Sequence, residues 1–141
     1  MSAPLVRLRV VGVPVPQGSM RAFVVRGRPI LTSTSRDLKG WRATIAQAMQ
    51  TQRTGPQLTI PVRLSLTFFV PKPKSAPKKK QTWPVKRPDM DKLVRAVFDA
   101  LSRVLYGDDS QVVHLSAAKV WATDTEPPGV LIEAWDGRES P

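Results

Sequence analysis

The segment PKPKSAPKKKQTWPVKRP, residues 71–88, limits the possible folds more than any other part of this sequence. Because each of its five prolines lacks a backbone N–H, it can form neither a helix nor a central strand. It also carries seven lysine and arginine residues and no acid. We therefore expect an extended basic loop that divides the chain into two sets of regular elements.

Hydrophobic periodicity predicts the elements on both sides of this loop. Alternating apolar and polar residues predict one hairpin and four single strands: the hairpin at 22–32 and the strands at 5–13, 61–70, 112–123 and 130–136. Apolar residues at helical spacing predict helices at 34–53 and 91–105. This order predicts a single domain, residues 1–141, of mixed α/β (α+β) class, with two main helices packed on a small mixed β-sheet.

The second predicted helix has two kinds of apolar position. Its buried stripe is expected to consist of Leu93, Val97, Leu101 and Val104. Ala96 and Ala100 are small, so they allow a neighbouring element to approach this helix closely.

The composition excludes several classes of protein. No apolar run approaches the ~20 residues that cross a bilayer, and Arg7 and Arg9 interrupt the start of the chain, unlike a signal peptide. The absence of cysteine excludes disulfides and thiolate metal sites. We expect a cytoplasmic protein, with no membrane contact, in which oxygen atoms or His114 bind any metal. His114 itself reads as a structural residue of a strand, with a general-base role as the alternative.

Charge is distributed very unevenly along the chain. Residues 1–88 hold 17 basic residues and one acid, whereas residues 89–141 hold 5 basic residues and 10 acids. A basic body of this size attracts polyanions and binds phosphates with release of counterions. Nucleic acid is therefore the favoured partner, while a solvated surface or an anionic membrane contact is the alternative.

The basic loop is expected to follow a DNA strand. Lys78, Lys79 and Lys80 would contact phosphates, and Trp83 would stack on a base. The alternatives are a solvated connector and a tryptophan that packs against the body of the protein. The complete set of expected DNA contacts is Arg7, Arg9, Arg21, Arg26, Arg28, Lys78, Lys79, Lys80, Trp83, Lys86, Arg87 and Lys119.

Four aspartates flank the second predicted helix. Asp89 and Asp91 lie at its start, and Asp108 and Asp109 follow its end. Carboxylates in these positions often cap helices or form turns. Next to a basic loop, however, they also suit a nuclease, because Mg²⁺ takes oxygen ligands and neutralises a scissile phosphate.

The run RPDMDKLVRAVFDALSRVLYGDDSQV, residues 87–112, closely resembles the RusA-like Holliday-junction resolvases. These are small endodeoxyribonucleases often carried by phages and prophages. Their pattern is roughly P-D-x-D-N-L-x-K-A-x-x-D-A-L, then D-D-S-Q-V and a later lysine, and it is matched here as far as Asp99 and Lys119. The N-terminal stretch GVPVPQGSMRA is similar to the family's first strand and turn, though less specifically.

The resemblance implies a Mg²⁺-dependent enzyme, with Mn²⁺ as a possible substitute, that resolves four-way DNA junctions. It implies that Asp89, Asp91 and Asp109 bind the metal ion, with Asp108 as an adjacent contributor. Two positions depart from the family pattern: Lys92 replaces an asparagine and Arg95 replaces a lysine. Arginine stays protonated, so the residue at 95 can stabilise charge in the transition state but cannot abstract a proton. The lysine at 92 could share that work.

The length of the second helix predicts a dimer. A helix over 91–104 is ~21 Å long, and the five residues after it span at most ~18 Å. One chain therefore cannot bring Asp109 to Asp89 and Asp91. We expect a homodimer that pairs through this helix, antiparallel, so that each active site takes residues from both subunits. The alanines at 96 and 100 would suit the crossing.

Two other functions remain open. A non-catalytic, architectural DNA-binding module would use the aspartates only as caps and would bind DNA without any need for Mg²⁺. A basic RNA- or ribosome-associated protein would prefer RNA and tolerate Asp89→Asn. Neither accounts for both the D-x-D and the DDSQV sequences.

Overall fold

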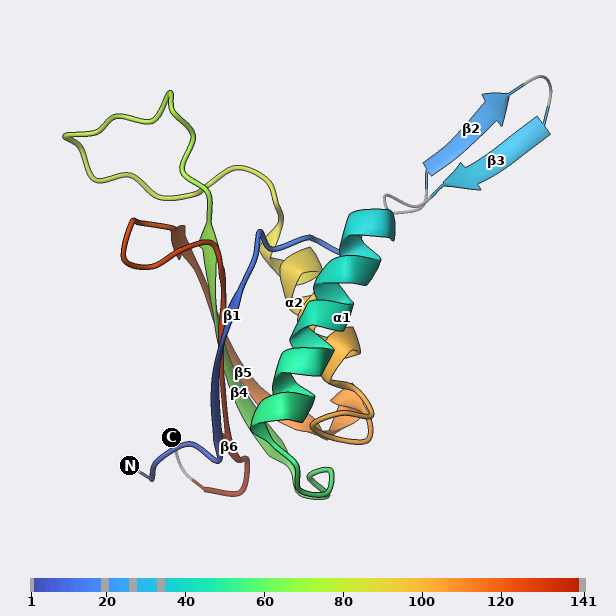
Figure 1. The fold of residues 1–141 in the computed structure, drawn as a ribbon, viewed down its shortest axis with the longest axis vertical. Helices are drawn as coiled ribbons and strands as arrows, with labels where there is room; N and C mark the ends of the chain where they lie inside the picture. The colour runs from blue at the N-terminus through green and yellow to red at the C-terminus, as the bar shows by residue number, and fades with distance from the viewer. Residues whose placement is uncertain (1, 19–20, 26–27, 33–34, 140–141) are drawn as a thin grey trace.

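The computed structural model describes residues 2–18, 21–25, 28–32 and 35–139. Its elements in chain order are β1 (Val6–Val11), β2 (Arg21–Val25), β3 (Arg28–Thr32), α1 (Ser35–Gln52), β4 (Val62–Val70), α2 (Met90–Leu101), the 3₁₀ helix η1 (Asp109–Gln111), β5 (Val112–Trp121) and β6 (Gly129–Asp136). Figure 1 shows their arrangement. The expected mixed sheet with two main helices is confirmed, and residues 71–88 contain neither helix nor strand.

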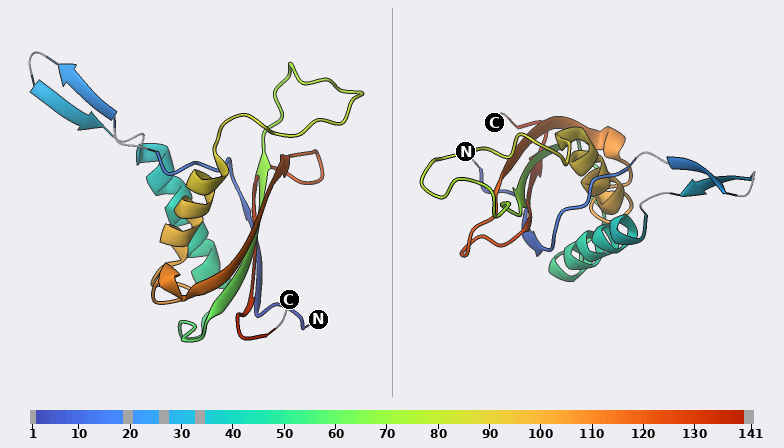
Figure 2. Two further views of the ribbon diagram at one scale, coloured as in Figure 1. Left: turned by 180° about the vertical axis from the view of Figure 1, so that it is seen from behind. Right: turned by 90° about the horizontal axis from the view of Figure 1, so that it is seen from above.

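Four strands form the main sheet in the order β1-β6-β4-β5. β4 and β5 are parallel, whereas β6 is antiparallel to both β1 and β4. Parallel neighbours need a crossover connection, which the basic loop and α2 supply together. Figure 2 shows α1 and α2 on the same face of this sheet. β2 and β3 pair with each other in a separate two-stranded sheet.

The core lies between the sheet and the two helices. Alternate residues of β4 are buried on the helix side, as the strand period of two requires. The residues that fill the space from both layers include Ile45, Met49, Leu64, Leu66, Phe68, Leu93, Val97 and Leu101, all at most 1% exposed. This packing fixes α2 against the sheet, and with it the residues at both ends of α2.

The opposite face of the sheet is held by arginines stacked on aromatic rings. The guanidinium carbon of Arg9 lies 4.1 Å from the centre of the Phe69 ring, and that of Arg63 lies 4.1 Å from the centre of the Trp135 ring. Such cation–π contacts cover apolar surface while the charge stays near solvent. None of the helices in the described ranges is long and apolar enough to cross a membrane.

α2 differs from the expected helix at its C-terminal end. It stops at Leu101 instead of residue 105, because Ser102 takes an extended conformation and its hydroxyl donates to the carbonyl oxygen of Phe98, at 2.9 Å. Arg103 then adopts a positive φ of 65°. The apolar spacing continues through Val104, so periodicity alone extends the helix too far.

The expected role of Ala96 and Ala100 in a helix crossing between subunits is wrong. They are 0% and 5% exposed, respectively, and belong to the hydrophobic core of the chain itself. Their small size serves close packing inside the subunit. The exposed side of α2 instead carries Asp91, Arg95 and Asp99.

Gly129 provides a test of this packing. A Cβ at this residue would overlap the carbonyl oxygen of Val10 on the neighbouring strand, so Gly129→Ala must push β1 and β6 apart. We expect a loss of about 3 kcal/mol in the free energy of unfolding, measured by urea denaturation. Gly40→Ala is the matched control, because a Cβ there has no neighbour within 4 Å.

Gly40 lies inside α1, where alanine is the better helix former, so its replacement should stabilise the protein by about 1 kcal/mol. Equal effects of the two changes would contradict the close approach of β1 to β6.

Candidate active site

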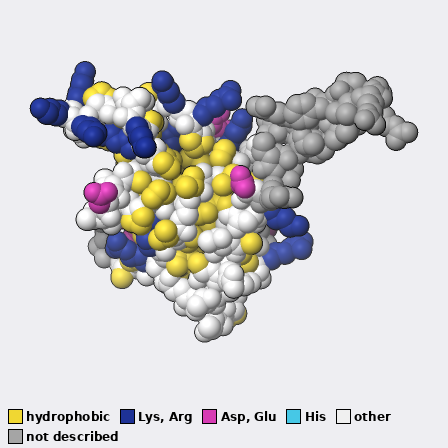
Figure 3. Space-filling view, turned by 45° about the horizontal axis from the view of Figure 1, so that its top comes forward, with side chains coloured by type: hydrophobic (Ala, Val, Ile, Leu, Met, Phe, Trp, Pro, Cys, Tyr) yellow, Lys and Arg dark blue, Asp and Glu magenta, His cyan; other side chains and the backbone are white. Residues whose placement is uncertain are grey.

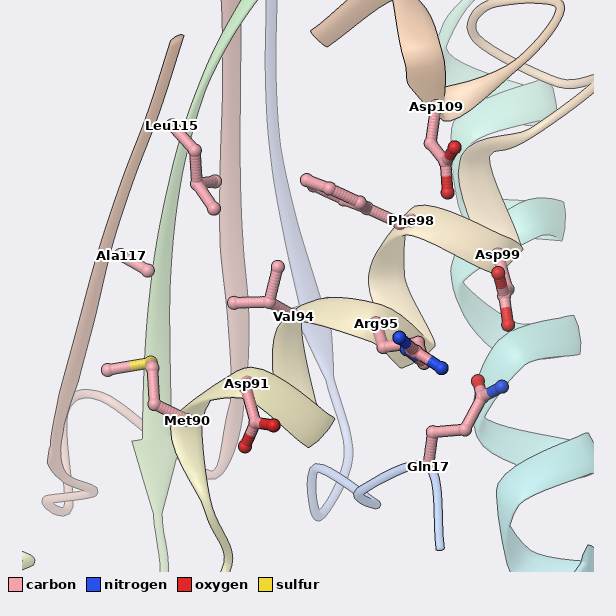
Figure 4. A pocket seen from close by; sticks show the side chains of 10 residues that line it. All are labelled: Gln17, Met90, Asp91, Val94, Arg95, Phe98, Asp99, Asp109, Leu115 and Ala117. Atoms are coloured by element: carbon pink, nitrogen blue, oxygen red, sulfur yellow. The ribbon is translucent and has the colours of Figure 1, made fainter. Parts of the chain in front are cut away.

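A cleft of about 700 Å³ runs along α2 beside β5. Its lining residues are Gln17, Met90, Asp91, Val94, Arg95, Phe98, Asp99, Asp109, Leu115 and Ala117. Figure 4 shows apolar side chains in the middle and carboxylates at the two ends. Such a shape suits a polar reaction at each end and an apolar contact between them.

Asp91 and Asp109 occupy opposite ends of the cleft (Figure 4). Asp91 comes from the first turn of α2, and Asp109 opens η1. Within the described ranges, neither carboxylate takes part in a hydrogen bond or an ion pair, although many neighbouring groups do. Both carboxylates are therefore available to an external ligand.

Asp89 occupies the N-cap position of α2 but does not cap it. Its backbone is extended, and its side chain accepts no hydrogen bond from the helix. The Asp89 carboxylate instead lies 3.8 Å from the Lys92 ammonium, and both side chains are about half exposed. An exposed pair of this kind contributes little to stability. Helix capping thus fails to explain the first member of the D-x-D sequence.

Asp108, in contrast, is a true cap. Its side chain accepts a hydrogen bond from the backbone N–H of Ser110 at 3.0 Å, and Gln111 completes a reciprocal capping box. The hydrogen bonds from Ser110 lower the pKa of the Asp108 carboxyl. The side chain of Gln111 also donates to the carbonyl oxygens of Leu58 and Ile60. This network anchors the segment that presents Asp109.

Two further charged residues lie on the exposed side of α2. Arg95 is exposed and lines the cleft between its two acidic ends. Asp99 also lines the cleft, but its carboxylate lies 3.5 Å from the Arg42 guanidinium on α1. Arg95 is thus open to an external anion, whereas Asp99 connects the two helices.

Gln17 and Phe98 are cleft residues that sequence reasoning did not single out. The backbone N–H of Gln17 donates to the carbonyl oxygen of Lys92 at 3.0 Å, which ties the N-terminal stretch to α2. Its buried side-chain oxygen has no hydrogen-bond partner among the described residues. In the sequence, Gln17 could be noticed only as part of the stretch GVPVPQGSMRA, and that stretch indicated no role for its side chain.

Lys119 binds the backbone of the residues that precede the D-x-D sequence. Its ammonium donates to the carbonyl oxygens of Lys86 at 2.8 Å and Pro88 at 2.7 Å. These contacts run from β5 to the last residues before Asp89. The side chain is therefore occupied inside the protein, and we assign it a positioning role in place of a DNA contact.

This role predicts a specific defect in Lys119→Met. The end of the loop would lose two charge-assisted hydrogen bonds, so Asp89 would be held less well. If the acids bind Mg²⁺ for junction cleavage, as the sequence resemblance implies, loss of this supporting contact should raise the Mg²⁺ concentration needed for half-maximal cleavage by about 10-fold. Lys74→Met is the control, because this exposed loop lysine should affect DNA affinity but not the metal requirement. A DNA-affinity defect alone in Lys119→Met would contradict the positioning role.

The other expected DNA contacts divide into three groups. The exposed group consists of Arg7 and the loop residues Lys78, Lys79, Lys80, Trp83, Lys86 and Arg87. Arg9 stacks on Phe69, donates to the carbonyl oxygen of Pro127 and lies 3.6 Å from Glu126, so we leave it out of the proposed contacts. Arg26, and the side chains of Arg21 and Arg28, lie outside the described residues. Figure 3 shows Lys and Arg side chains projecting around the loop at the upper left.

The described part of a single chain does not gather a complete metal site. No three carboxylate, imidazole or thiol groups in these ranges lie close enough together to bind one ion. The carboxylates of Asp89, Asp91 and Asp109 are nevertheless the hard oxygen ligands that Mg²⁺ prefers, and all three are open to solvent to some degree. They fit a divalent cation in kind.

Three similarities to known proteins were found. The family model described as Endodeoxyribonuclease RusA matches residues 12–133. The chain is 30% identical over 128 residues to Uncharacterized protein YqaN of Bacillus subtilis (strain 168), covering 84% of this chain and 89% of the relative. It is 41% identical over 64 residues to Crossover junction endodeoxyribonuclease rusA of Lactococcus phage r1t, covering 43% of this chain and 46% of the phage protein. The family match spans the basic loop, α2 and all four flanking aspartates.

Proposed function

The chain belongs to the RusA family of junction-resolving endodeoxyribonucleases, and we propose that it cuts four-way DNA junctions with paired, symmetric nicks that depend on Mg²⁺. Nucleases of this family generally depend on a divalent metal ion. The observation that carries the proposal is the pair of carboxylates, Asp91 and Asp109, at opposite ends of one cleft, which no other described residue engages. Free carboxylates in the cleft of a strongly basic protein favour a nuclease over a module in which they only cap helices.

A homodimer would complete each site. If a second copy seats on the cleft with its α2 antiparallel to the first, Asp109 of the partner subunit comes beside Asp91, and the reverse holds at the other end. Two features support this arrangement. The middle of the cleft is apolar, with Leu115 45% exposed. β5 also lies at the edge of the four-stranded sheet, where a neighbour can approach.

The proposed mechanism assigns roles to five charged residues on α2 and at its two ends. Asp89, Asp91 and the partner subunit's Asp109 would hold Mg²⁺, which when bound neutralises the scissile phosphate and lowers the pKa of an attacking water. Arg95 stabilises the extra negative charge on the phosphate oxygens in the transition state. Lys92 offsets the charge of Asp89 and so reduces its repulsion of DNA. Cleavage of the P–O3′ bond leaves a 5′-phosphate and a 3′-hydroxyl.

The direct test offers the protein a synthetic four-way junction and a linear duplex of the same sequence, with Mg²⁺ or with a chelator. We expect paired, symmetric cuts in the junction alone, and only in Mg²⁺, while binding persists in both conditions. Junction binding without cleavage in any divalent ion would favour the architectural module. Tighter binding to RNA than to DNA would favour a basic RNA- or ribosome-associated protein.

The basic loop predicts a measurable salt dependence. Lys78, Lys79 and Lys80 are exposed in the structure and would each neutralise a phosphate. Replacing all three with alanine should make the slope of log affinity against log salt shallower by about 2.7, at ~0.9 per phosphate contact. The measurement is junction binding at several salt concentrations in chelator. Arg138→Ala is the control, because this arginine is paired with Asp136 at the end of β6, and an equal change there would sink the assignment.

A further inference from the structure

A second hollow lies under the basic loop, separate from the cleft along α2. Its volume is about 360 Å³, within the range of about 300–1,000 Å³ typical of small-molecule sites. Its walls come from several prolines of the loop, from Pro14, and from two tryptophans, Trp83 and Trp121. The Trp121 indole N–H donates to the Thr82 hydroxyl at 3.1 Å, so that ring is anchored in place. We call this hollow the tryptophan pocket.

The tryptophan pocket leaves large apolar side chains in contact with water. Trp83 is 61% exposed and Val85 is 85% exposed, although both line the pocket. Exposed apolar surface gathered at one hollow is typical of interaction sites and ligand-binding grooves. The expected alternative, a tryptophan that simply packs against the protein, does not fit a ring that is mostly open to solvent.

Positive charge surrounds this apolar surface. Lys86 and Arg87 line the pocket and are themselves exposed, and the lysines at 78–80 follow its wall at Pro77. Figure 3 shows hydrophobic side chains among the Lys and Arg side chains at the upper left. A ligand matched to this site has a flat apolar face and an adjoining negative charge. A nucleotide has both, because its base can stack and its phosphate is an anion.

We propose that the tryptophan pocket binds one unpaired nucleobase of a DNA strand, with Trp83 stacked on the base and Lys86 and Arg87 near its phosphates. This inference rests on the proposed function, since it takes branched DNA as the substrate. Arg87 and Pro88 form part of the pocket, and Asp89 follows them directly in the chain. Lys119 fixes the carbonyl groups of Lys86 and Pro88. A base captured here would therefore place its strand beside the acidic site.

The test compares two single strands with the same number of phosphates. One is a short, labelled oligothymidine, and the other is a strand of the same length that has abasic residues throughout and so carries no bases. In chelator, the full-length protein should bind the thymidine strand about 10-fold more tightly, because only this strand offers bases for stacking. Trp83→Ala should remove this preference by weakening the thymidine complex alone. Trp83→Phe, which keeps an aromatic face, should retain most of it.

Lys79→Ala is the matched control from the same loop. It should weaken both complexes by the same factor, because it removes a phosphate contact and leaves the pocket intact. The inference is overturned if wild-type protein binds both strands equally, or if Trp83→Ala weakens both equally. Junction cleavage measured in parallel separates the two proposals. Base preference without cleavage would refute the nuclease mechanism alone, and cleavage without base preference would refute the pocket alone.

Discussion

Mixing two inactive variants, Asp91→Asn and Asp109→Asn, should restore junction cleavage. Asparagine keeps the size of each side chain but removes its charge. If each site combines Asp91 of one subunit with Asp109 of its partner, a mixed dimer has one site with both residues altered and one with both intact. A dimer of either variant alone has two damaged sites. The expected loss in each pure variant is about 10³-fold, which corresponds to ~4 kcal/mol of transition-state stabilisation.

The experiment mixes the two variants under conditions that exchange subunits and measures nicking of a four-way junction. The mixed dimers should nick only one strand, since they hold one intact site. Asp89→Asn mixed with Asp91→Asn is the matched control. In each site, Asp89 and Asp91 come from the same subunit. Every mixed dimer therefore has one altered residue in each of its two sites and stays inactive. If the first mixture also stays inactive although mixed dimers form, the acids work within one chain.

Leu115→Lys should break the dimer and with it the activity. Leu115 is 45% exposed and lines the apolar middle of the cleft, where the partner subunit is expected to sit. A lysine there would bury an unpaired charge in the interface. We expect the dissociation constant of the dimer to rise about 10³-fold, or ~4 kcal/mol, with a parallel loss of cleavage at low protein concentration. Sedimentation velocity and junction cleavage are the two measurements.

Leu5→Lys is the control for this change. Leu5 is 54% exposed, but it lies beside β1, at the opposite edge of the sheet from β5. The two variants introduce the same charge at similarly exposed leucines, so a general effect on solubility would appear in both. If the Leu115→Lys protein remained dimeric and active, the proposal that the cleft forms part of the dimer interface would be wrong.

Most of the fold could be predicted from local patterns. The alternation from Val62 to Val70 gives β4 directly, and the prolines of residues 71–88 exclude helix and strand there. The end of α2 could not be predicted. It depends on a hydrogen bond from the Ser102 hydroxyl and on a positive φ at Arg103, and arginine is not a residue type that indicates a positive φ. Helix ends of this kind are set by specific contacts, which the spacing of apolar residues does not reveal.

The acids that flank α2 could be identified from the sequence, but which of them caps a helix could not. In the sequence, Asp89 could be read as a helix cap and Asp108 as a turn residue. Only the structure separates them, since Asp108 caps η1 while Asp89 caps nothing. Lys119 could be found by its place in the family pattern, but its partners lie 33 and 31 residues away in the chain. Ala96 and Ala100 were expected to contact the helix of a second subunit, but they pack in the core of their own chain. Their small size alone does not show which element packs against them.

The crossover between β4 and β5 has a consequence for how such a chain can diversify. The long proline-containing stretch begins at a sheet strand and ends where Lys119 clamps the backbone just ahead of the acids. Insertions, deletions or swaps within the stretch should therefore leave the backbone that leads into Asp89 in place. Substrate preference and catalytic chemistry can thus evolve, or be engineered, as separate traits of one small protein.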